Sequence, residues 1–261
     1  MEKTSLISSK QNAEPLVAIQ ALRACRILVI NGKGGAGKTT VSTNLAAMMA
    51  KRGDSTALLD ADPQGSSQFW VKNRDKELPA VFGLKLDSNS RTTNSFQMRA
   101  PKSTRWLVTD APPGLSGPAL DDLVRDHDLI LIPVMPSDID IRTSARFIGD
   151  LLLTQNMRRN RRPIAVIANR TKQKTNSWGR LEKFLLSLNI PYPTTLRDSQ
   201  NYVRAYSEGR GIVEYPQQSH FRDRNDWDSL LRWIDAQNIS NAWWKEKLAL
   251  AVPPENGSEL A

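Results

Sequence analysis

The 261-residue sequence predicts an α/β fold, a single domain with a mostly parallel, doubly wound sheet flanked by helices on both faces. Two observations predict this fold class. Short apolar segments alternate along the chain with amphipathic segments of helical period, which is the pattern of βαβ units. The first clear strand, at 26–30, also runs directly into a glycine-rich loop that a helical pattern follows.

Continuous apolar runs predict the remaining strands, because strands of a parallel sheet are buried on both faces. These runs occupy Thr56–Asp60, Trp106–Asp110, Leu129–Val134 and 164–168. The first helix is expected from about residue 38 to 52, where Gly53 provides a C-terminal stop. Further helices are expected through 69–71 and at 116–126, 142–156, 178–188, 226–236 and 241–251. Residues 85–104 are polar and are expected to be irregular.

The chain is expected to divide into three parts. Residues 1–24 carry no clear strand pattern and are expected to form an N-terminal arm or a short helix near 14–23. Residues 25–238 hold the alternating pattern and form the main domain. Residues 239–261 are expected to form a C-terminal helix and a flexible tail.

Charge is distributed unevenly along the chain. The formal net charge is +9, and the segment 140–224 alone holds sixteen Lys or Arg against seven Asp or Glu, so it carries the whole surplus. A basic surface of this kind favours polyanionic partners, with nucleic acid first and anionic lipid second. The alternative is a solvated basic face that serves solubility.

Cysteine content and apolar content exclude several classes. The lone Cys25 cannot form an intrachain disulfide, and no Cys or His cluster suits zinc or iron–sulfur. The start of the chain lacks the basic-then-apolar order of a signal peptide, and no apolar run is long enough to span a bilayer. A reducing, cytoplasmic location is therefore expected.

The glycine-rich loop fits a phosphate-binding pattern. Gly32, Gly37, Lys38 and Thr39 match G-x4-G-K-[ST], the signature of a P-loop NTPase sheet. Backbone N–H groups must curl around phosphate oxygens, so side chains are excluded where phosphate approaches. Lys38 is expected to reach the β- and γ-phosphates of ATP, and the Thr39 hydroxyl to bind Mg²⁺ directly.

Carboxylates at two strand ends support this site. Asp60 and Asp110 each end an apolar strand, so both are expected at the carboxyl edge of the sheet, where ligands bind. Both are expected to act on magnesium through water, with Asp110 as the Walker-B acid. Asp62 lies beyond the strand end, where it could approach the γ-phosphate or simply cap a turn.

These segments together resemble the ParA/MinD family of deviant Walker A ATPases, closest to the small ParA-type partition and cargo-positioning ATPases. Residues 33–40 (KGGAGKTT) resemble its KGGxGKT box, and residues 60–65 (DADPQG) resemble its DxDPQG box. Residues 110–114 (DAPPG) and 131–137 (LIPVMPS) resemble its DxPP and IPVxPS segments. The matches follow family order from about residue 26 to 215.

The resemblance implies roles for several residues. Lys33 matches the signature lysine that touches the partner's ATP across a sandwich homodimer, and Asp62 matches the residue that orients the attacking water. Asn169 and Arg170 resemble the family's adenine-contacting pair. The residues expected to bind nucleotide are Gly34, Gly35, Ala36, Gly37, Lys38, Thr39, Thr40, Asn169 and Arg170.

The resemblance also implies ATP-dependent, non-specific DNA binding, an association with the nucleoid, and a ParB-like or other adaptor protein that stimulates weak ATP hydrolysis. Lys and Arg without a base-reading motif suit phosphate contacts. The candidate DNA contacts are Arg158, Arg159, Arg161, Arg162, Lys172, Lys174, Lys183, Arg180, Arg197, Arg204, Arg210, Arg222 and Arg224. The first four could instead be a solvated helix end.

Three other functions stay open at this point. A MinD-like membrane ATPase would use the amphipathic segment 243–250, although packing on the domain is the favoured role of that segment. An ATP-dependent ligase or a non-hydrolysing nucleotide switch would use the same loop. The cargo of a partition ATPase is a plasmid or chromosome by base rate, with a carboxysome as an alternative.

Overall fold

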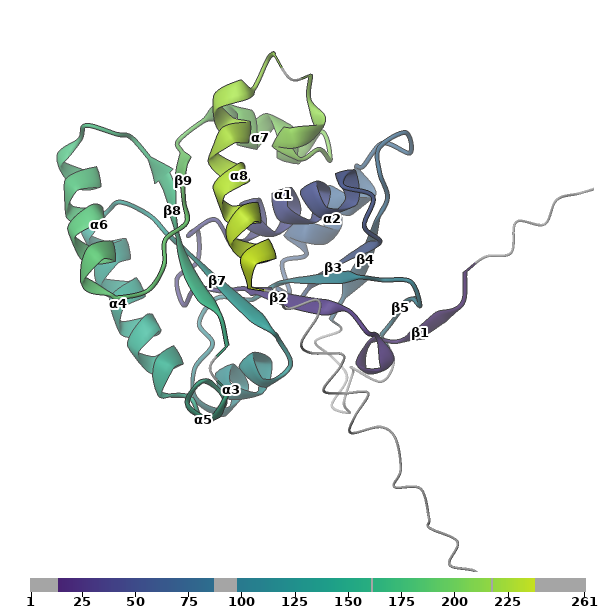
Figure 1. Cartoon of the computed structure of the whole chain (residues 1–261), viewed down its shortest axis with the longest axis horizontal. Helices are drawn as coiled ribbons and strands as arrows, with labels where there is room; N and C mark the ends of the chain where they lie inside the picture. Colours follow the sequence, from purple (N-terminus) through teal and green to yellow (C-terminus); the bar gives the residue numbers. More distant parts are fainter. Residues whose placement is uncertain (1–13, 87–97, 161, 217, 238–261) are drawn as a thin grey trace, which may run out of the picture.

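A computed structural model describes residues 14–86, 98–160, 162–216 and 218–237. Seven parallel strands form one sheet in the order β4-β3-β6-β2-β7-β8-β9. The central strands are β2 (Cys25–Val29), β6 (Trp106–Asp110) and β7 (Leu129–Val134), and the flanking strands are β3 (Thr56–Asp60), β4 (Val81–Lys85), β8 (Ile164–Thr171) and β9 (Thr194–Arg197). Figure 1 shows these strands crossing the molecule.

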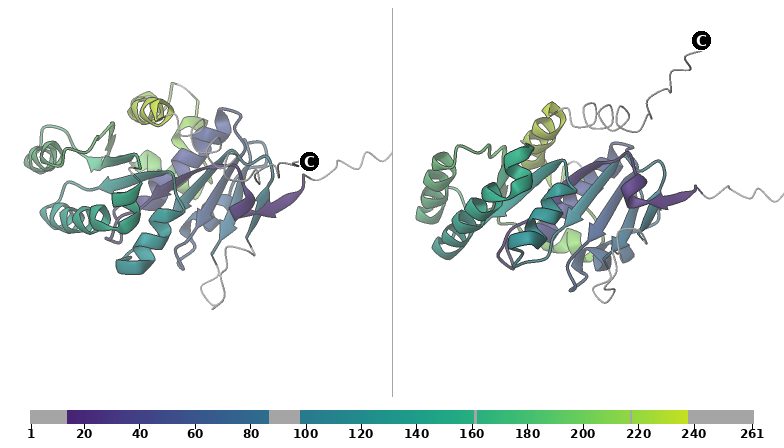
Figure 2. Two further views of the ribbon diagram at one scale, coloured as in Figure 1. Left: turned by 60° about the horizontal axis from the view of Figure 1, so that its bottom comes forward. Right: turned by 90° about the horizontal axis from the view of Figure 1, so that it is seen from below.

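Helices cover both faces of the sheet, as predicted, because the strand residues alternate between two apolar clusters. Ile27 and Val29 pack toward one face, and Leu28 packs toward the other. The first face carries α1 (Lys38–Lys51), α2 (Ser66–Lys72), α7 (Gln200–Ser207) and α8 (Phe221–Ala236). The second carries α3 (Gly117–Arg125), α4 (Asp138–Leu153), α5 (Gln155–Arg159) and α6 (Asn176–Ser187). Figure 2 shows helices on both sides of the strands.

The N-terminal segment differs from the expected helix. Residues 16–18 form β1 (Leu16–Ala18), and a single 3-10 turn, η1 (Ile19–Ala21), follows. β1 pairs antiparallel with β5 (Arg99–Pro101), which lies in the region expected to be irregular. Ile19 and Leu22 are buried against the sheet with Leu59 and Leu107. A distant partner strand and this apolar contact decide the conformation, and neither produces a local period.

Side-chain caps move two helix boundaries from their expected positions. α4 begins at residue 138, four residues before the expected start, because the Ser137 hydroxyl accepts a hydrogen bond from Asp140 N at 3.1 Å. Thr154 then accepts from Met157 N and starts α5, so the expected helix 142–156 is two helices. α8 also starts earlier than expected, at residue 221 and not 226, but without a side-chain cap. The expected helix 241–251 lies outside the described residues.

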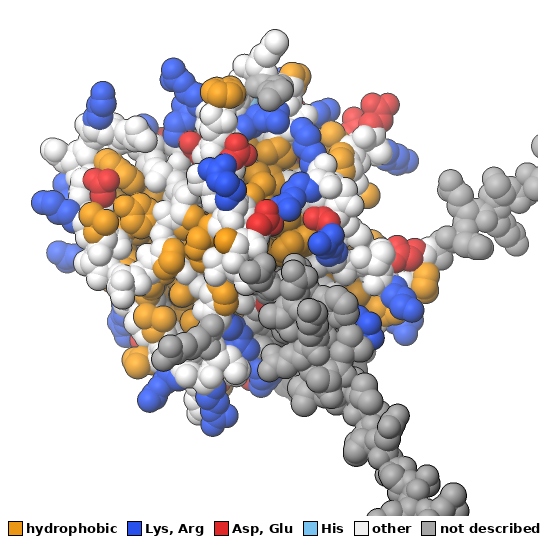
Figure 3. Space-filling view, in the orientation of Figure 1, with side chains coloured by type: hydrophobic (Ala, Val, Ile, Leu, Met, Phe, Trp, Pro, Cys, Tyr) orange, Lys and Arg blue, Asp and Glu red, His pale blue; other side chains and the backbone are white. Residues whose placement is uncertain are grey.

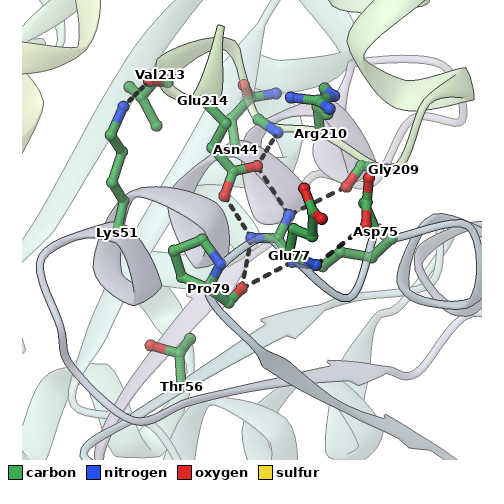
Figure 4. Close-up of polar contacts among 12 residues, drawn as sticks. Asn44, Lys51, Thr56, Asp75, Glu77, Pro79, Gly209, Arg210, Val213 and Glu214 are labelled. Atoms are coloured by element: carbon green, nitrogen blue, oxygen red, sulfur yellow. Dashed lines mark hydrogen bonds and ion pairs between the residues drawn. The ribbon is translucent and has the colours of Figure 1, made fainter.

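A polar network anchors the segment 209–214, including η3 (Ile212–Glu214), to the rest of the domain (Figure 4). Glu214 accepts hydrogen bonds from Arg74 Nη1 and Gly211 N, both at 2.8 Å. Lys51 donates to Val213 O, and Asn44 Oδ1 accepts from Ile212 N at 2.7 Å. The network joins the chain after α7 to α1 and to the end of α2.

Candidate nucleotide-binding site

The glycine-rich loop joins β2 to α1 at the carboxyl edge of the sheet, as predicted. Gly37 caps α1 with a φ of 93°, a left-handed conformation that favours glycine. A Cβ at Gly37 would lie 2.0 Å from Asn169 Nδ2, so the site also lacks room for a side chain. Asn169 donates to Ala36 O at 2.9 Å and thereby braces the loop from the end of β8.

Lys38 points into this loop. Its side chain is buried, and Nζ donates to Lys33 O at 3.1 Å. Burial lowers the pKa of Lys38, while Asp110 and Asp62 act in the opposite direction. The ammonium group thus lies at the centre of the loop, where a phosphate would offer it the charge partner that burial demands.

Asp60 and Asp110 lie side by side, because β3 and β6 pair in register at these two residues. Asp110 Oδ2 accepts hydrogen bonds from Thr39 Oγ1 at 2.8 Å and from Ser67 Oγ at 2.6 Å. Burial raises the pKa of Asp110 to about 6, although the two hydroxyls pull it down. A hydroxyl held beside a carboxylate fits a hydrated magnesium ion, which keeps waters and takes other ligands from the phosphates.

The described residues contain no group of three or more His, Cys, Asp or Glu that could hold a metal ion by themselves.

Asp60 accepts hydrogen bonds from the backbone N–H groups of Asp62 at 3.1 Å and Gln68 at 2.9 Å, so it holds the turn that carries Asp62. Asp62 is partly exposed and accepts from Gln64 N at 3.0 Å. Its carboxylate therefore caps the turn and also faces solvent beside the loop.

Lys33 lies against its own chain. Its Nζ is 2.5 Å from an Asp140 carboxylate oxygen at the start of α4, and its backbone N–H donates to Asn31 Oδ1 at 3.0 Å. The Asp140 carboxylate is buried, whereas about a third of the Lys33 side chain is exposed. The sequence motif contained no sign of this ion pair.

A cavity of about 410 Å³ continues from the loop toward the ends of β8 and β9. The predicted residues Thr39, Thr40, Asn169 and Arg170 line one part of it. The connection 197–200 and the α7 side chains of Tyr202 and Tyr206 form the opposite wall. A nucleoside attached to phosphates at the loop fits this position and size. Sequence reasoning missed the α7 wall, because α7 is a short helix with polar residues on most sides.

The basic residues expected to contact DNA lie at opposite ends of the sheet. Arg158 and Arg159 are exposed at the end of α5, before β8 begins, whereas Lys172 and Lys174 are exposed after β8 ends. Figure 3 likewise shows Lys and Arg side chains dispersed around the visible face. Arg161 lies outside the described residues.

Several of these side chains already have partners within the domain. Arg162 donates to the carbonyl oxygens of His127, Asn156 and Arg125, and Arg224 donates to Tyr215 O. Four others form ion pairs: Lys172 with Asp198, Arg180 with Asp138, Arg197 with Asp223, and Arg204 with Glu208. Arg210 lies over the Tyr215 ring. Lys183 and Arg222 are exposed.

Across the ranges that the structure describes, no helix combines the length and apolar character needed to cross a bilayer. The segment 243–250, considered above for membrane attachment, lies outside those ranges.

Comparisons with known proteins identify relatives of this chain. The family model for the CobQ/CobB/MinD/ParA nucleotide binding domain matches residues 27–212. The maintenance of carboxysome distribution protein A of Halothiobacillus neapolitanus is 30% identical over 193 residues, which cover 74% of this chain and 88% of the relative. The chromosome-partitioning ATPase Soj of Thermus thermophilus is 52% identical over 116 residues, 43% of this chain and 46% of the relative.

Solved structures show the same fold at lower identity. The MinC:MinD cell division complex of Aquifex aeolicus aligns with a TM-score of 0.64 at 22% identity, covering 82% of this chain and 96% of that one. Apo McdA of Cyanothece aligns with a TM-score of 0.58 at 15% identity, covering 79% and 99%.

Proposed function

Because this chain belongs to the CobQ/CobB/MinD/ParA family of nucleotide-binding proteins, we propose that it is an ATPase that binds ATP with magnesium, dimerises over the nucleotide and moves a cargo along DNA. The observation that carries the ATP- and magnesium-binding part of this proposal is the Thr39–Asp110 hydrogen bond of 2.8 Å beside the buried Lys38. It brings a loop cation, a magnesium-binding hydroxyl and a strand-end carboxylate to one point.

Each residue has a task in hydrolysis. The backbone N–H groups of residues 34–40 hold the phosphates, and Lys38 neutralises charge on the β- and γ-phosphates. Thr39 would hold magnesium, with Asp60 and Asp110 acting on it through water, and the ion would supply screening of the negative charge on the phosphate oxygens. Asp62 orients the attacking water from its turn beyond β3. Asn169 keeps the loop in its binding conformation through Ala36 O.

In this proposal, Lys33 is the residue through which each subunit contributes to the nucleotide site of its partner. A second cation on the phosphates stabilises developing charge, as an arginine finger does. In the sandwich homodimer, Lys33 leaves Asp140 and reaches the nucleotide of the partner subunit. ATP then joins two copies, and hydrolysis releases them. The Lys33 side chain is partly exposed, which supports such a movement.

Non-specific DNA is the proposed track. Two copies present twice the number of exposed basic side chains, and affinity for a polyanion rises steeply with the number of phosphates that the protein neutralises. The segment after β8, with Lys172 and Lys174, lies at the same edge of the sheet as the nucleotide site. We favour this edge over Arg158 and Arg159, because ATP-dependent dimerisation changes it directly.

The proposed cargo follows from the relatives. One is named for carboxysome distribution and another for chromosome partitioning, so a large cargo that must be distributed is the common element, and we place this cargo on nucleoid DNA in the cytoplasm. A plasmid, a chromosome or a carboxysome would each need an adaptor protein that binds this ATPase and stimulates its weak hydrolysis.

The test is a salt titration of DNA binding, with and without ATP, on wild type and two double variants. We expect ATP to strengthen binding and log K to fall linearly with log salt. The slope should decrease by about 0.9 for each DNA phosphate that a variant no longer neutralises. Lys172→Ala/Lys174→Ala should show the larger decrease in slope, and Arg158→Ala/Arg159→Ala the smaller one. A DNA affinity of the wild type that changes with neither ATP nor salt concentration would refute the proposal. ATP-dependent binding to anionic vesicles instead of DNA would favour a MinD-like function.

A further inference from the structure

The carboxylate of Asp223 is buried on α8, away from the phosphate loop, and it collects three hydrogen bonds. Arg197 Nη2 donates to it at 2.5 Å, Asn201 Nδ2 at 2.6 Å and Ser199 Oγ at 3.4 Å. A charge with no exposure to water needs such partners, because removing it from water is costly. The three donors therefore depend on Asp223 as much as Asp223 depends on them.

All three donors lie in one short segment, residues 197–201, which runs from the last residue of β9 into the first turn of α7 and is called the connection 197–201 below. Arg197 and Ser199 from this connection line the nucleotide cavity. The segment has further contacts: Asp198 N donates to Thr171 O at 3.0 Å, the exposed Asp198 carboxylate pairs with Lys172, and Asn201 N donates to Ser199 Oγ at 3.2 Å. Asp223 is thus the buried charge around which the connection is arranged.

The same helix also fixes the next part of the cavity wall. Trp227 Nε1 donates to the Tyr202 hydroxyl at 3.0 Å, and the two rings contact each other with their centroids 6.5 Å apart. Tyr202 lines the cavity from α7. A second α8 carboxylate, Asp226, lies 3.8 Å from Arg197 Nε, and burial raises its pKa to about 6. α8 therefore supports the cavity wall at both Arg197 and Tyr202.

The cavity has two independently built sides. Residues 34–40 form the phosphate side, and Asn169 braces it from β8. The connection 197–201 and α7 form the far side. Phosphates bound at the loop would not contact this side, so only the nucleoside part of the ligand would. We propose that Asp223 is a positioning residue that sets the affinity of the site for the nucleoside part of its ligand, by holding Arg197, Ser199 and Asn201 in place. This inference rests on the proposed nucleotide-binding function and names the element that recognises the base and ribose.

The experiment compares ADP with inorganic pyrophosphate, both with magnesium, by calorimetry on the full chain. Pyrophosphate reports the phosphate side alone, and the ratio of the two dissociation constants reports what the nucleoside adds. Asp223→Asn keeps the shape of the side chain but removes its charge and turns an N–H group toward the donors. We expect this variant to bind ADP about tenfold more weakly, the size expected for removal of a charge-assisted hydrogen bond, with pyrophosphate binding unchanged.

Two further variants complete the test. Asp228→Asn on the exposed side of α8 is the matched control and should leave both constants unchanged. Asn201→Ala removes one donor and keeps the Arg197–Asp223 pair, so a smaller decrease confined to ADP is expected even if Asp223→Asn folds poorly. An equal decrease in ADP and pyrophosphate affinity, or no decrease in ADP affinity, in both Asp223→Asn and Asn201→Ala would overturn the inference. A wild type that binds neither ligand would instead refute the nucleotide-binding proposal.

Discussion

Lys33 Nζ lies 2.5 Å from the Asp140 carboxylate, so the lysine proposed to reach a partner's nucleotide is held within its own chain. Asp140 is fixed in turn, because its carboxylate accepts a hydrogen bond from the Ser137 hydroxyl at the start of α4. Dimerisation must therefore break an existing ion pair before Lys33 gains a new one. The free energy with which the Lys33–Asp140 pair stabilises the monomer therefore opposes dimerisation.

Asp140→Asn removes this opposing interaction. We expect ATP-dependent dimers to form at a roughly 30-fold lower protein concentration, since a partly buried pair contributes on the order of 1 kcal/mol and each dimer breaks two such pairs. Analytical ultracentrifugation with ATP measures the change. Asp138→Asn is the matched control, because Asp138 lies on the same turn of α4 as Asp140. Its ion pair is an exposed one, formed with Arg180 of α6. Weaker dimerisation of Asp140→Asn would show that the carboxylate supports the dimer.

Asp62→Ala should separate nucleotide binding from hydrolysis. The variant keeps the loop, Lys38 and the Thr39–Asp110 contact, so ATP binding and dimerisation should persist. Turnover should fall by about 100-fold or more, because the attacking water has no orienting group. Phosphate release measures turnover, and Lys38→Ala provides the variant expected to abolish ATP binding as well. Normal turnover in Asp62→Ala would remove Asp62 from the mechanism.

Ser67 contributes a hydroxyl to Asp110 that the sequence did not suggest. Ser67→Ala leaves Asp110 with fewer donors, so its carboxylate should be less well oriented toward magnesium. We expect the magnesium concentration for half-maximal ATPase activity to rise about tenfold, the size typical for residues that orient a metal ligand. Ser66→Ala tests the neighbouring position, which lines the nucleotide cavity, and should keep the magnesium requirement of wild type. An unchanged magnesium requirement in both variants would make the Ser67 contact purely structural.

Strands buried on both faces could be predicted from the sequence almost to the residue. Thr56–Asp60, Trp106–Asp110 and Leu129–Val134 are continuous apolar runs, and the structure has strands with the same bounds. β9 (Thr194–Arg197) was missed because half of its residues are only partly buried, so no apolar run marks it. β1 and β5 have three residues each and depend on each other.

The motif residues of the site could be predicted for the same local reason, since the glycine loop and the strand-end carboxylates lie in short segments. The residues that support them could not. Ser67 meets Asp110, Asp140 meets Lys33, and Asp223 meets Arg197 only after distant segments pack together. Nothing in the local pattern around a serine or an aspartate indicates such a partner.

His127 should make stability depend on pH. It is buried with Nδ1 2.6 Å from Leu123 O and Nε2 2.7 Å from Thr109 Oγ1, so the neutral ring donates to the carbonyl and accepts from the hydroxyl. Burial lowers the pKa of His127 to about 4, below its ordinary value of 6.5. Between these values the unfolded chain binds the additional proton, so the contribution of His127 to stability is complete above pH 6.5 and is lost as pH falls toward 4.

The comparison of wild type with His127→Gln isolates this effect, because both proteins keep the other titrating groups. The stability advantage of wild type should shrink by about 3 kcal/mol between pH 7 and pH 4, from 1.36 kcal/mol for each pKa unit. Urea unfolding at a series of pH values provides the free energies. An advantage that stays constant over this range would mean that His127 titrates normally in the fold.

Glu214 and Arg74 form the ion pair whose removal should cost the most stability. Their side chains are only 1% and 4% exposed, and Arg74 also lies over the Trp70 ring. Glu214→Ala would leave the Arg74 guanidinium buried without its charge partner, so we expect the free energy of unfolding to fall by about 3–5 kcal/mol. Asp235→Ala breaks an exposed pair with Arg52 and should cost less than about 1 kcal/mol. Urea unfolding distinguishes the two, and similar decreases in both variants would show that burial does not set the strength of the Arg74–Glu214 pair.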